Sequence, residues 1–367
     1  MLTTSDVPSV DIADLSSDDP ARLDRAAEAL RTGYGDFGVV TISGHGIEPS
    51  ELDAYYLAFR EVLARPAVEK AAWHRADIWY QRGWTPPNTE AAVVAQGVRD
   101  FKECWFASPT EPDADAAACF PELFAANVWP EGANDFQRLH LSLGRALHET
   151  GCLLLRGCER ALGLDAGTFD ALTAGAAHVT RALAYLPLDE EEAARGLLWG
   201  EEHTDFNLLT ILAGGRFYDP SGNVAGKPDD RSGLYLRTRP TAEHPRGRMV
   251  PGRAPADHIV SQVGQQLEIL TGGTFLATPH VIKAPGVAGW SRTNMAHFVH
   301  VHPLKTLAPL PPFRTPAAVE AYRPPVLAGT YALKTLVDIS LAPPETLDSF
   351  GYRHYGRLAG IRSEGEW

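Results

Sequence analysis

His203 and Asp205 stand two residues apart at the start of an apolar run, EEHTDFNLLTIL. At the spacing of a β-strand, two such side chains point to the same face. His280, in the run TPHVIKAP, offers a second imidazole from another predicted strand. Two histidines and one carboxylate can occupy one face of an octahedral metal ion and leave its other positions open, as in non-haem Fe(II) oxygenases. We therefore predict that these three residues bind a metal, although an H-x-D triplet alone also fits an ordinary charged strand entry.

Arg292 follows His280 in the run SRTNMAHF, and at strand spacing it shares a face with Asn294. We place this face inside a barrel, where a buried arginine requires an anionic partner. The planar guanidinium suits a carboxylate held by two hydrogen bonds. If the metal chelates one end of a dicarboxylate, Arg292 can hold the other end, and Tyr185 in LAYLP can add a hydroxyl hydrogen bond. The alternative is a solvent-exposed arginine on a surface strand.

The first part of the chain alternates between short β-type runs and helical periodicity. VPSVDIADL reads as a strand, and a helix is predicted from Asp19 to about Gly33. GVVTISGHGI is a strand closed by glycines, and a second helix over 49–73 breaks near Pro66. Residues 77–134 are rich in Trp, Pro and Asn and are predicted to be irregular, and a long helix is predicted from Asp135 to about Leu164.

From about Val179 the chain consists of short β-type runs separated by Gly, Pro and Asp, which favours a sandwich or barrel. These runs are TRALAYLPL, NLLTILAGG, GLYLRTR, HIVSQVGQQLEIL, FLATPHVIKAP and SRTNMAHFVHVHPL, and a last helical region follows them. The order indicates one β core wrapped by helices rather than two independent domains. Residues 214–233 and 238–257 are rich in Gly, Pro and charge, so they are either lids or binding loops or simple surface loops.

The bulk composition is that of an ordinary globular protein. The chain has 367 residues, of which 44% are hydrophobic and 22% charged, enough to bury a core without disulfides or structural metals. A net charge of -13 argues against a nucleic-acid binder. The sequence shows neither a signal peptide nor an apolar run long enough to cross a membrane. We therefore predict a cytoplasmic protein with a small-molecule substrate, reduced cysteines and no membrane partner, whose oligomeric state the sequence does not specify.

Taken in order, these motifs are similar to those of the isopenicillin N synthase-like family of Fe(II)/2-oxoglutarate-dependent dioxygenases. YGDFGVVTISGHGI, RGWTPP, DFKECW and NVWPEG resemble the N-terminal part of that family. HTDFNLLTIL, GLYL, VGQQLEILTGGTFLATPH and then Arg292 follow the order of its catalytic core. Each triplet alone is a weak signal, but the ordered set runs nearly from end to end of the chain.

The resemblance implies a mainly β fold with flanking helices, built as a double-stranded β-helix (jelly roll) with a helical N-terminal region. It divides the chain into four parts. Residues 1–134 would form an N-terminal dioxygenase-type region and 135–178 a connecting long helix. Residues 179–310 would form the catalytic jelly roll and 311–367 a C-terminal helical segment.

The resemblance also implies a reaction and a set of site residues. Fe(II) would be held by His203, Asp205 and His280, and 2-oxoglutarate by Arg292, Asn294 and Tyr185. With O2, such an enzyme oxidises an unactivated C–H bond by hydroxylation, desaturation or cyclisation and releases succinate and CO2. The resemblance places Arg82 and Trp84 where family members have substrate-facing residues. Strand spacing puts Asn207 on the face of His203 and Asp205 and puts His300 on the face of Arg292, so these two are further candidate substrate contacts.

The sequence departs from the family pattern at three points. The usual R-x-S reads Arg292-Thr293-Asn294, the spacing from His280 to Arg292 is a few residues longer, and Val281 stands where the family often has Arg. Asn can still donate a hydrogen bond to a carboxylate. Two alternatives therefore stay open. One is an iron oxidase of the same fold that does not use 2-oxoglutarate, like isopenicillin N synthase itself or the plant ethylene-forming oxidases. The other is a non-catalytic member that binds metal or ligand.

Overall fold

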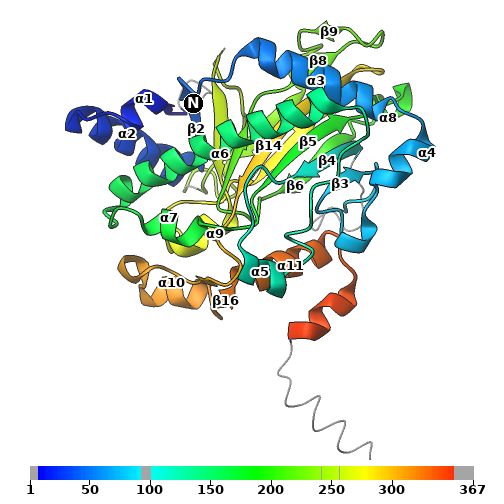
Figure 1. The fold of residues 1–367 in the computed structure, drawn as a ribbon. Coiled ribbons are helices and arrows are strands. Elements are labelled where there is room, and N and C mark those ends of the chain that lie inside the picture. The colour runs from blue at the N-terminus through cyan, green and yellow to red at the C-terminus, as the bar shows by residue number, and fades with distance from the viewer. Residues whose placement is uncertain (1–6, 92–100, 241, 256, 351–367) are drawn as a thin grey trace, which may run out of the picture.

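The computed structural model describes residues 7–91, 101–240, 242–255 and 257–350 (Figure 1). Two sheets form its centre. The larger sheet has the path β1 (Ser9–Asp11), β2 (Val39–Ser43), β12 (Ile259–Val263), β7 (Leu209–Leu212), β14 (Ser291–Val299), β5 (Val179–Tyr185), β4 (Lys102–Ala107) and β3 (Gly83–Thr85), and β8 (Arg216–Tyr218) and β9 (Val224–Ala225) lie beside this path. The smaller sheet has the order β11 (Met249–Pro251), β10 (Gly233–Arg237), β13 (His280–Lys283) and β6 (Leu198–His203).

The two sheets face each other across one interior chamber, because residues of both line it. Tyr185 and Arg292 come from the larger sheet, and His203 and His280 come from the smaller one. Strands far apart in sequence are neighbours, as where β2 pairs with β12. This is the predicted jelly-roll core, mainly β and flanked by helices, and that prediction is confirmed.

The long helix α6 (Asn134–Leu162) lies across the larger sheet, in front of β5 and β14 (Figure 1). Its buried side chains include Leu143, Leu147 and Leu154. Two glycines on this face permit the close approach, since a Cβ on Gly144 would lie 2.6 Å from the Thr180 hydroxyl, and one on Gly151 would lie 2.8 Å from a Val299 methyl group. The helix predicted for this region is therefore confirmed, and it backs the strands that carry the site.

The remaining helices surround this core. In the N-terminal part, α2 (Pro20–Thr32) starts at its N-cap Asp19, whose carboxylate accepts a hydrogen bond from the Ala21 amide. It continues as a short π-helical turn to Phe37 and stops at Gly38, whose φ is 66°. The others are α1 (Ile12–Leu15), α3 (Pro49–Leu63), α4 (Ala67–Lys70), α5 (Ala114–Cys119), α7 (Thr168–Thr173), α8 (Glu190–Ala194), α9 (Gln265–Leu270), α10 (Pro316–Ala321) and α11 (Ala328–Asp338).

The structure corrects five of the predicted segments. The strand over residues 7–15 is only β1, after which the chain turns into α1. The region 77–134 is not wholly irregular, because β3 and β4 extend the larger sheet and α5 follows. The run 258–270 is β12 followed by α9, and the presumed loops 214–233 and 238–257 contain β8, β9 and β11. The end of the C-terminal helical segment, 351–367, lies outside the described residues.

Two further predictions concern properties of the whole chain. All four cysteines are free. Across the described residues, we find no helix with both the length and the apolar character that a membrane crossing requires.

Candidate metal and co-substrate site

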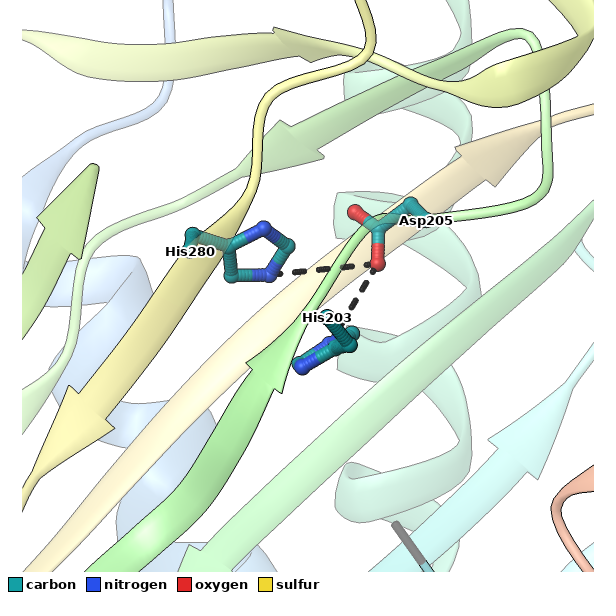
Figure 2. Close-up of side chains that lie close together, drawn as sticks. All are labelled: His203, Asp205 and His280. Atoms are coloured by element: carbon teal, nitrogen blue, oxygen red, sulfur yellow. Dashed lines mark ion pairs between the residues drawn. The ribbon is translucent and has the colours of Figure 1, made fainter. Parts of the chain in front are cut away.

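The predicted triad comes together at one end of the smaller sheet (Figure 2). His203 is the last residue of β6 and His280 the first of β13, and the two are paired in the register of these antiparallel strands. Asp205 lies just beyond β6, in the turn that follows it. The strand-spacing argument is therefore correct for the proximity of His203 and Asp205, although Asp205 itself is not in a strand.

The geometry of the three side chains suits a metal ion. One ligand atom of each lies within 4.8 Å of the others. The Nε2 atoms of His203 and His280 are 3.7 and 3.9 Å from the same oxygen of Asp205. Both Nδ1 atoms are hydrogen-bonded to backbone carbonyls. Nδ1 of His203 lies 2.7 Å from the Glu201 carbonyl oxygen, and Nδ1 of His280 lies 3.0 Å from the Thr278 carbonyl oxygen. Since Nδ1–H must donate to a carbonyl oxygen, each Nε2 keeps a lone pair for a metal.

Asp205 is held by its neighbours on both sides. The Thr210 hydroxyl donates to Oδ2 of Asp205 at 2.6 Å, and the Asn207 amide donates to the same hydroxyl at 3.2 Å. The backbone of this turn is bound to the start of α9, where the Gln265 amide donates to the Asp205 carbonyl at 2.8 Å. The close fit needs glycine at 264, because a Cβ there would lie 2.1 Å from the Asn207 carbonyl oxygen.

The electrostatics favour the protonation states that metal binding requires. Burial alone would raise the pKa of Asp205, but His280, His203 and the Thr210 hydroxyl outweigh it and lower the pKa below its usual value. Desolvation, followed by the nearby imidazole of His280, lowers the pKa of His203. At neutral pH the site therefore presents a carboxylate and a neutral imidazole at His203.

Arg292 lies in the same chamber, which has a volume of about 310 Å³ and is also lined by Asn294 and Tyr185. The guanidinium is 5.6 Å from the ring centroid of Tyr185 and 5.7 Å from that of Phe217. Among the residues that the structure describes, none accepts a hydrogen bond from its Nη1, and Oδ1 of Asn294 also has no partner. Burial lowers the pKa of Arg292 from its ordinary value. A half-buried cation whose Nη1 is inaccessible to solvent and has no recorded acceptor indicates that a ligand carboxylate completes this end of the chamber.

The residues predicted to contact a substrate do not all meet in one place. Arg82, Asn207 and His300 line a second cavity of about 540 Å³, to which His203 and Asp205 also belong. Trp84 is not among the residues that line either cavity. Its indole N–H donates to the Glu103 carboxylate at 2.7 Å, so we leave Trp84 out of the substrate site.

Sequence reasoning missed two groups of residues in these cavities. Gln262 is 1% exposed and lines the chamber of Arg292, yet neither atom of its amide has a partner. Its place in the apolar run of β12 was the only available signal, a buried amide among hydrophobic residues. Glu90, Lys102 and Arg181 form a buried ionic cluster, with contacts of 2.9 Å from Lys102 and 2.6 Å from Arg181 to the carboxylate. Lys102 and Arg181 line both cavities.

The chain resembles known proteins over most of its length. Residues 7–132 match the family model described as the N-terminal region of a non-haem dioxygenase in morphine synthesis. Homoarginine-6-hydroxylase 2-ODD-233 of Oryza sativa subsp. japonica is 23% identical over 286 residues, which cover 75% of this chain and 80% of the rice protein. Leucoanthocyanidin dioxygenase of Malus domestica is 22% identical over 313 residues, covering 83% of this chain and 76% of the apple protein.

A solved structure supports the fold. A full-length Neurospora crassa protein in complex with alpha-KG superposes with a TM-score of 0.69 at 18% identity, covering 90% of this chain and 96% of that one. The order of motifs, the jelly roll and the named relatives agree with one another. In its motifs and its fold the chain is similar to the isopenicillin N synthase-like family of Fe(II)/2-oxoglutarate-dependent dioxygenases, and it is a non-haem iron dioxygenase that uses Fe(II), 2-oxoglutarate and O2.

Proposed function

We propose that this dioxygenase oxidises an unactivated C–H bond of a small molecule and that His203, Asp205 and His280 hold its iron. The observation that carries the proposal is the convergence of two Nε2 atoms and one carboxylate within 4.8 Å, in a chamber that also holds Arg292, whose buried Nη1 has no acceptor among the described residues. A two-histidine, one-carboxylate set is the ligand set that Fe(II) oxygenases use. When bound there, iron supplies the activation of O2 that couples 2-oxoglutarate decarboxylation to substrate oxidation.

The chamber fits 2-oxoglutarate as well as iron. We assign the distal carboxylate of the co-substrate to Arg292, whose Nη1 has no protein acceptor. Asn294 replaces the usual serine but still offers an amide N–H, and its Oδ1 has no hydrogen-bond partner within the described ranges. Tyr185 pairs with Arg292 across β5 and β14, so its hydroxyl is available at the same end. Gln262 brings two further unpartnered polar atoms to this chamber.

The division of labour along the chain is also a proposal. Residues 179–310 would form the catalytic jelly roll, and 1–134 would supply strands and helices at its edge. The connecting helix within 135–178 would support the sheet, and the segment 311–367 would close the second cavity with α11, which contributes Tyr331 and Leu336 to its lining.

A same-fold oxidase that does not use 2-oxoglutarate would leave Arg292 without a role. In such an oxidase, the guanidinium of Arg292 would face the chamber without an anionic partner, and leaving a desolvated charge unpaired lowers the stability of the folded protein. The non-catalytic alternative is disfavoured because all three ligand atoms are present and both histidine tautomers are fixed by carbonyl groups. The succinate-release experiment below tests the proposal against both alternatives.

The test is succinate release from 2-oxoglutarate by the Fe(II)-loaded protein in air, with ascorbate present to supply the two electrons that turnover without a substrate needs, and with CO2 measured alongside. We expect the two products in equal amounts, in the slow turnover that such enzymes show without substrate. Asp205→Ala should lower the rate by at least about 100-fold, since it removes the only anionic ligand. Asp24→Ala, which removes an exposed carboxylate paired with Arg160 on the outer helices, is the matched control. Succinate release that is indifferent to Asp205→Ala would contradict the proposal.

A further inference from the structure

The second cavity meets the co-substrate chamber at the proposed iron ligands. His203 and Asp205 line both cavities, so a molecule in the second one has direct access to the metal centre. Its volume of about 540 Å³ suits a small organic molecule rather than a polymer. This cavity is the space in which a C–H bond can be presented to the iron.

Arg82 is a buried cation in the wall of this cavity. It lies just before β3, is 3% exposed and donates one hydrogen bond to the Gln81 carbonyl at 2.6 Å and one to the Leu123 carbonyl at 2.9 Å. A guanidinium has five N–H donors. Its Nε has no partner, and among the described residues no carboxylate lies within ion-pair distance of Arg82. Within the described part of the chain, the charge of Arg82 thus has no counter-ion and its Nε–H has no acceptor.

The other cations around the cavity are neutralised. Arg181 and Lys102 share the carboxylate of Glu90, and Lys334 pairs with Asp338 at 2.5 Å. Burial lowers the pKa of Arg82 to about 10, which still leaves the guanidinium charged at neutral pH. One positive charge without a counter-ion therefore faces this cavity in the described part of the chain.

His300 lines the second cavity together with Arg82 and two of the proposed iron ligands, His203 and Asp205. Its imidazole ring is 5.2 Å from the ring of Phe206, the residue after Asp205. A ligand bound to Arg82 would thus extend past His300 and Phe206 toward the iron ligands.

We propose that the substrate of this enzyme is a small carboxylic acid whose carboxylate binds Arg82 and whose apolar body lies in the second cavity. This inference rests on the proposed function, because it uses the iron position as the reacting end. A planar guanidinium with free N–H groups suits a carboxylate held by two hydrogen bonds. A single uncompensated charge matches a monoanion. Leu123, Leu336, Ile339 and Leu341 offer apolar surface for the rest of the molecule.

The test is binding of two acids, hexanoate and 3-phenylpropanoate, compared with hexanamide and 3-phenylpropanamide, to the Fe(II)-loaded, 2-oxoglutarate-saturated protein without O2. Calorimetric titration should give at least about 10-fold tighter binding of each acid than of its amide, since an amide lacks the charge. Arg82→Met removes the charge at similar length and should abolish the preference. Equal binding of acid and amide by the wild type, absence of acid binding, or a preference that survives Arg82→Met would overturn the proposal.

Two variants complete the design. Arg239→Met removes a guanidinium that, among the described residues, also donates to backbone carbonyls alone, those of Gly35, Gly273 and Thr274. Arg239 lines neither cavity, so the acid preference should stay unchanged. Arg82→Lys keeps the charge and guards against a Met variant that fails to fold. It should show a preference that is reduced but not lost, and an undiminished preference would contradict a role for the guanidinium.

The same samples separate this inference from the proposed function. The visible absorption band of the Fe(II)–2-oxoglutarate chelate is recorded before any acid is added. A normal band without acid preference overturns the assignment to Arg82 alone. If the protein prefers acids over amides through Arg82 but shows no absorption band of the chelate, the carboxylate site is supported. The assignment of the iron and co-substrate residues is then contradicted.

Discussion

The orientation of Asp205 depends on one hydroxyl group. Thr210 donates to the carboxylate oxygen that does not face the two histidines and in turn accepts from Asn207. Thr210 is 1% exposed, so this hydrogen bond is not replaced by water without rearrangement. Groups that orient a metal ligand typically contribute 10- to 100-fold to metal affinity.

Thr210→Val should therefore weaken Fe(II) binding by roughly 10- to 100-fold while leaving the fold intact, because valine has the same shape without the hydroxyl. Anaerobic titration with Fe(II) measures the effect. Thr210→Ser, which keeps the hydroxyl, is the matched control and should stay within a few-fold of the wild type. Equal affinities for the Val and Ser variants would show that Asp205 does not need this contact.

Among single residues, the sequence predicted those whose side-chain type alone suggests a metal-binding or anion-binding role. His203, Asp205, His280 and Arg292 could be selected because metal ligands and buried cations are rare in apolar runs. Thr210 and Gln262 could not, since a polar residue in a strand reveals its partners only when the neighbouring strands are placed. The position of Trp84 in a motif predicts a substrate contact, yet its indole N–H donates a hydrogen bond to Glu103 and Trp84 lines neither cavity.

Among the elements, the start of α9 decides where the metal-binding turn lies. The amides of Gly264, Gln265 and Gln266 donate to the carbonyls of Leu208, Asp205 and Asn207. Gly264 has a φ of -100°, which any residue can adopt. Glycine is required here by space rather than by backbone angle, because a Cβ would lie 2.1 Å from a carbonyl oxygen.

Gly264→Ala should therefore displace the turn that carries Asp205. We expect a loss of about 1–3 kcal/mol in the free energy of unfolding, as for other overpacked sites, together with metal affinity lowered by about tenfold or more. Chemical denaturation and Fe(II) titration give the two values. Gly226→Ala is the control, since a Cβ there meets nothing within 4 Å. Metal affinity unchanged in Gly264→Ala would mean that the turn is not fixed by α9.

The sequence could not reveal this junction, because HIVSQVGQQLEIL reads as one β-type run. In the structure the chain leaves β12 at Gly264 and forms α9. A short apolar run fits a strand and a buried helix equally well, and tertiary contacts decide between them. By contrast, α6 was predictable to within a few residues because its apolar periodicity is sustained over 29 residues.

In the whole molecule, the N-terminal region and the jelly roll share one sheet. Strand β4 pairs with β5 along its full length, and a buried ionic cluster joins Lys102 of β4 to Arg181 of β5 through Glu90. Burial alone would raise the pKa of Glu90, but Arg181 and Lys102 outweigh it and lower the pKa to about 2. Because the pKa is depressed in the folded state, this stabilisation is present above the unfolded pKa near 4.5 and is lost as the pH falls toward 2.

Glu90→Gln should therefore destabilise the protein by about 3 kcal/mol at neutral pH, since it removes the carboxylate that Lys102 and Arg181 share. The difference from wild type should shrink as the pH falls from about 5 to 2, because the protonated glutamic acid then resembles glutamine. Denaturant unfolding at a series of pH values measures this. Glu28→Gln, at an exposed pair with Arg31, should leave the pH profile nearly unchanged. A constant difference between Glu90→Gln and wild type would contradict the pairing.

The central claim is that iron and 2-oxoglutarate share one chamber, held by the triad at one end and Arg292 at the other. Anaerobic titration of the Fe(II)-loaded protein with 2-oxoglutarate, followed by the visible band of the chelate, tests it directly. The wild type should develop the band and saturate. Arg292→Met should shift the midpoint about 30-fold or more upward, in line with the loss of a buried charge pair.

Two variants serve as the negative and the positive control of this measurement. Asp205→Ala should give no band, and Arg138→Met, which removes an exposed arginine of α6, should match the wild type. The account predicts this pattern because the band requires both the metal ligands and the distal carboxylate site. A wild type without a band, or an Arg292→Met variant with an unshifted midpoint, would contradict it.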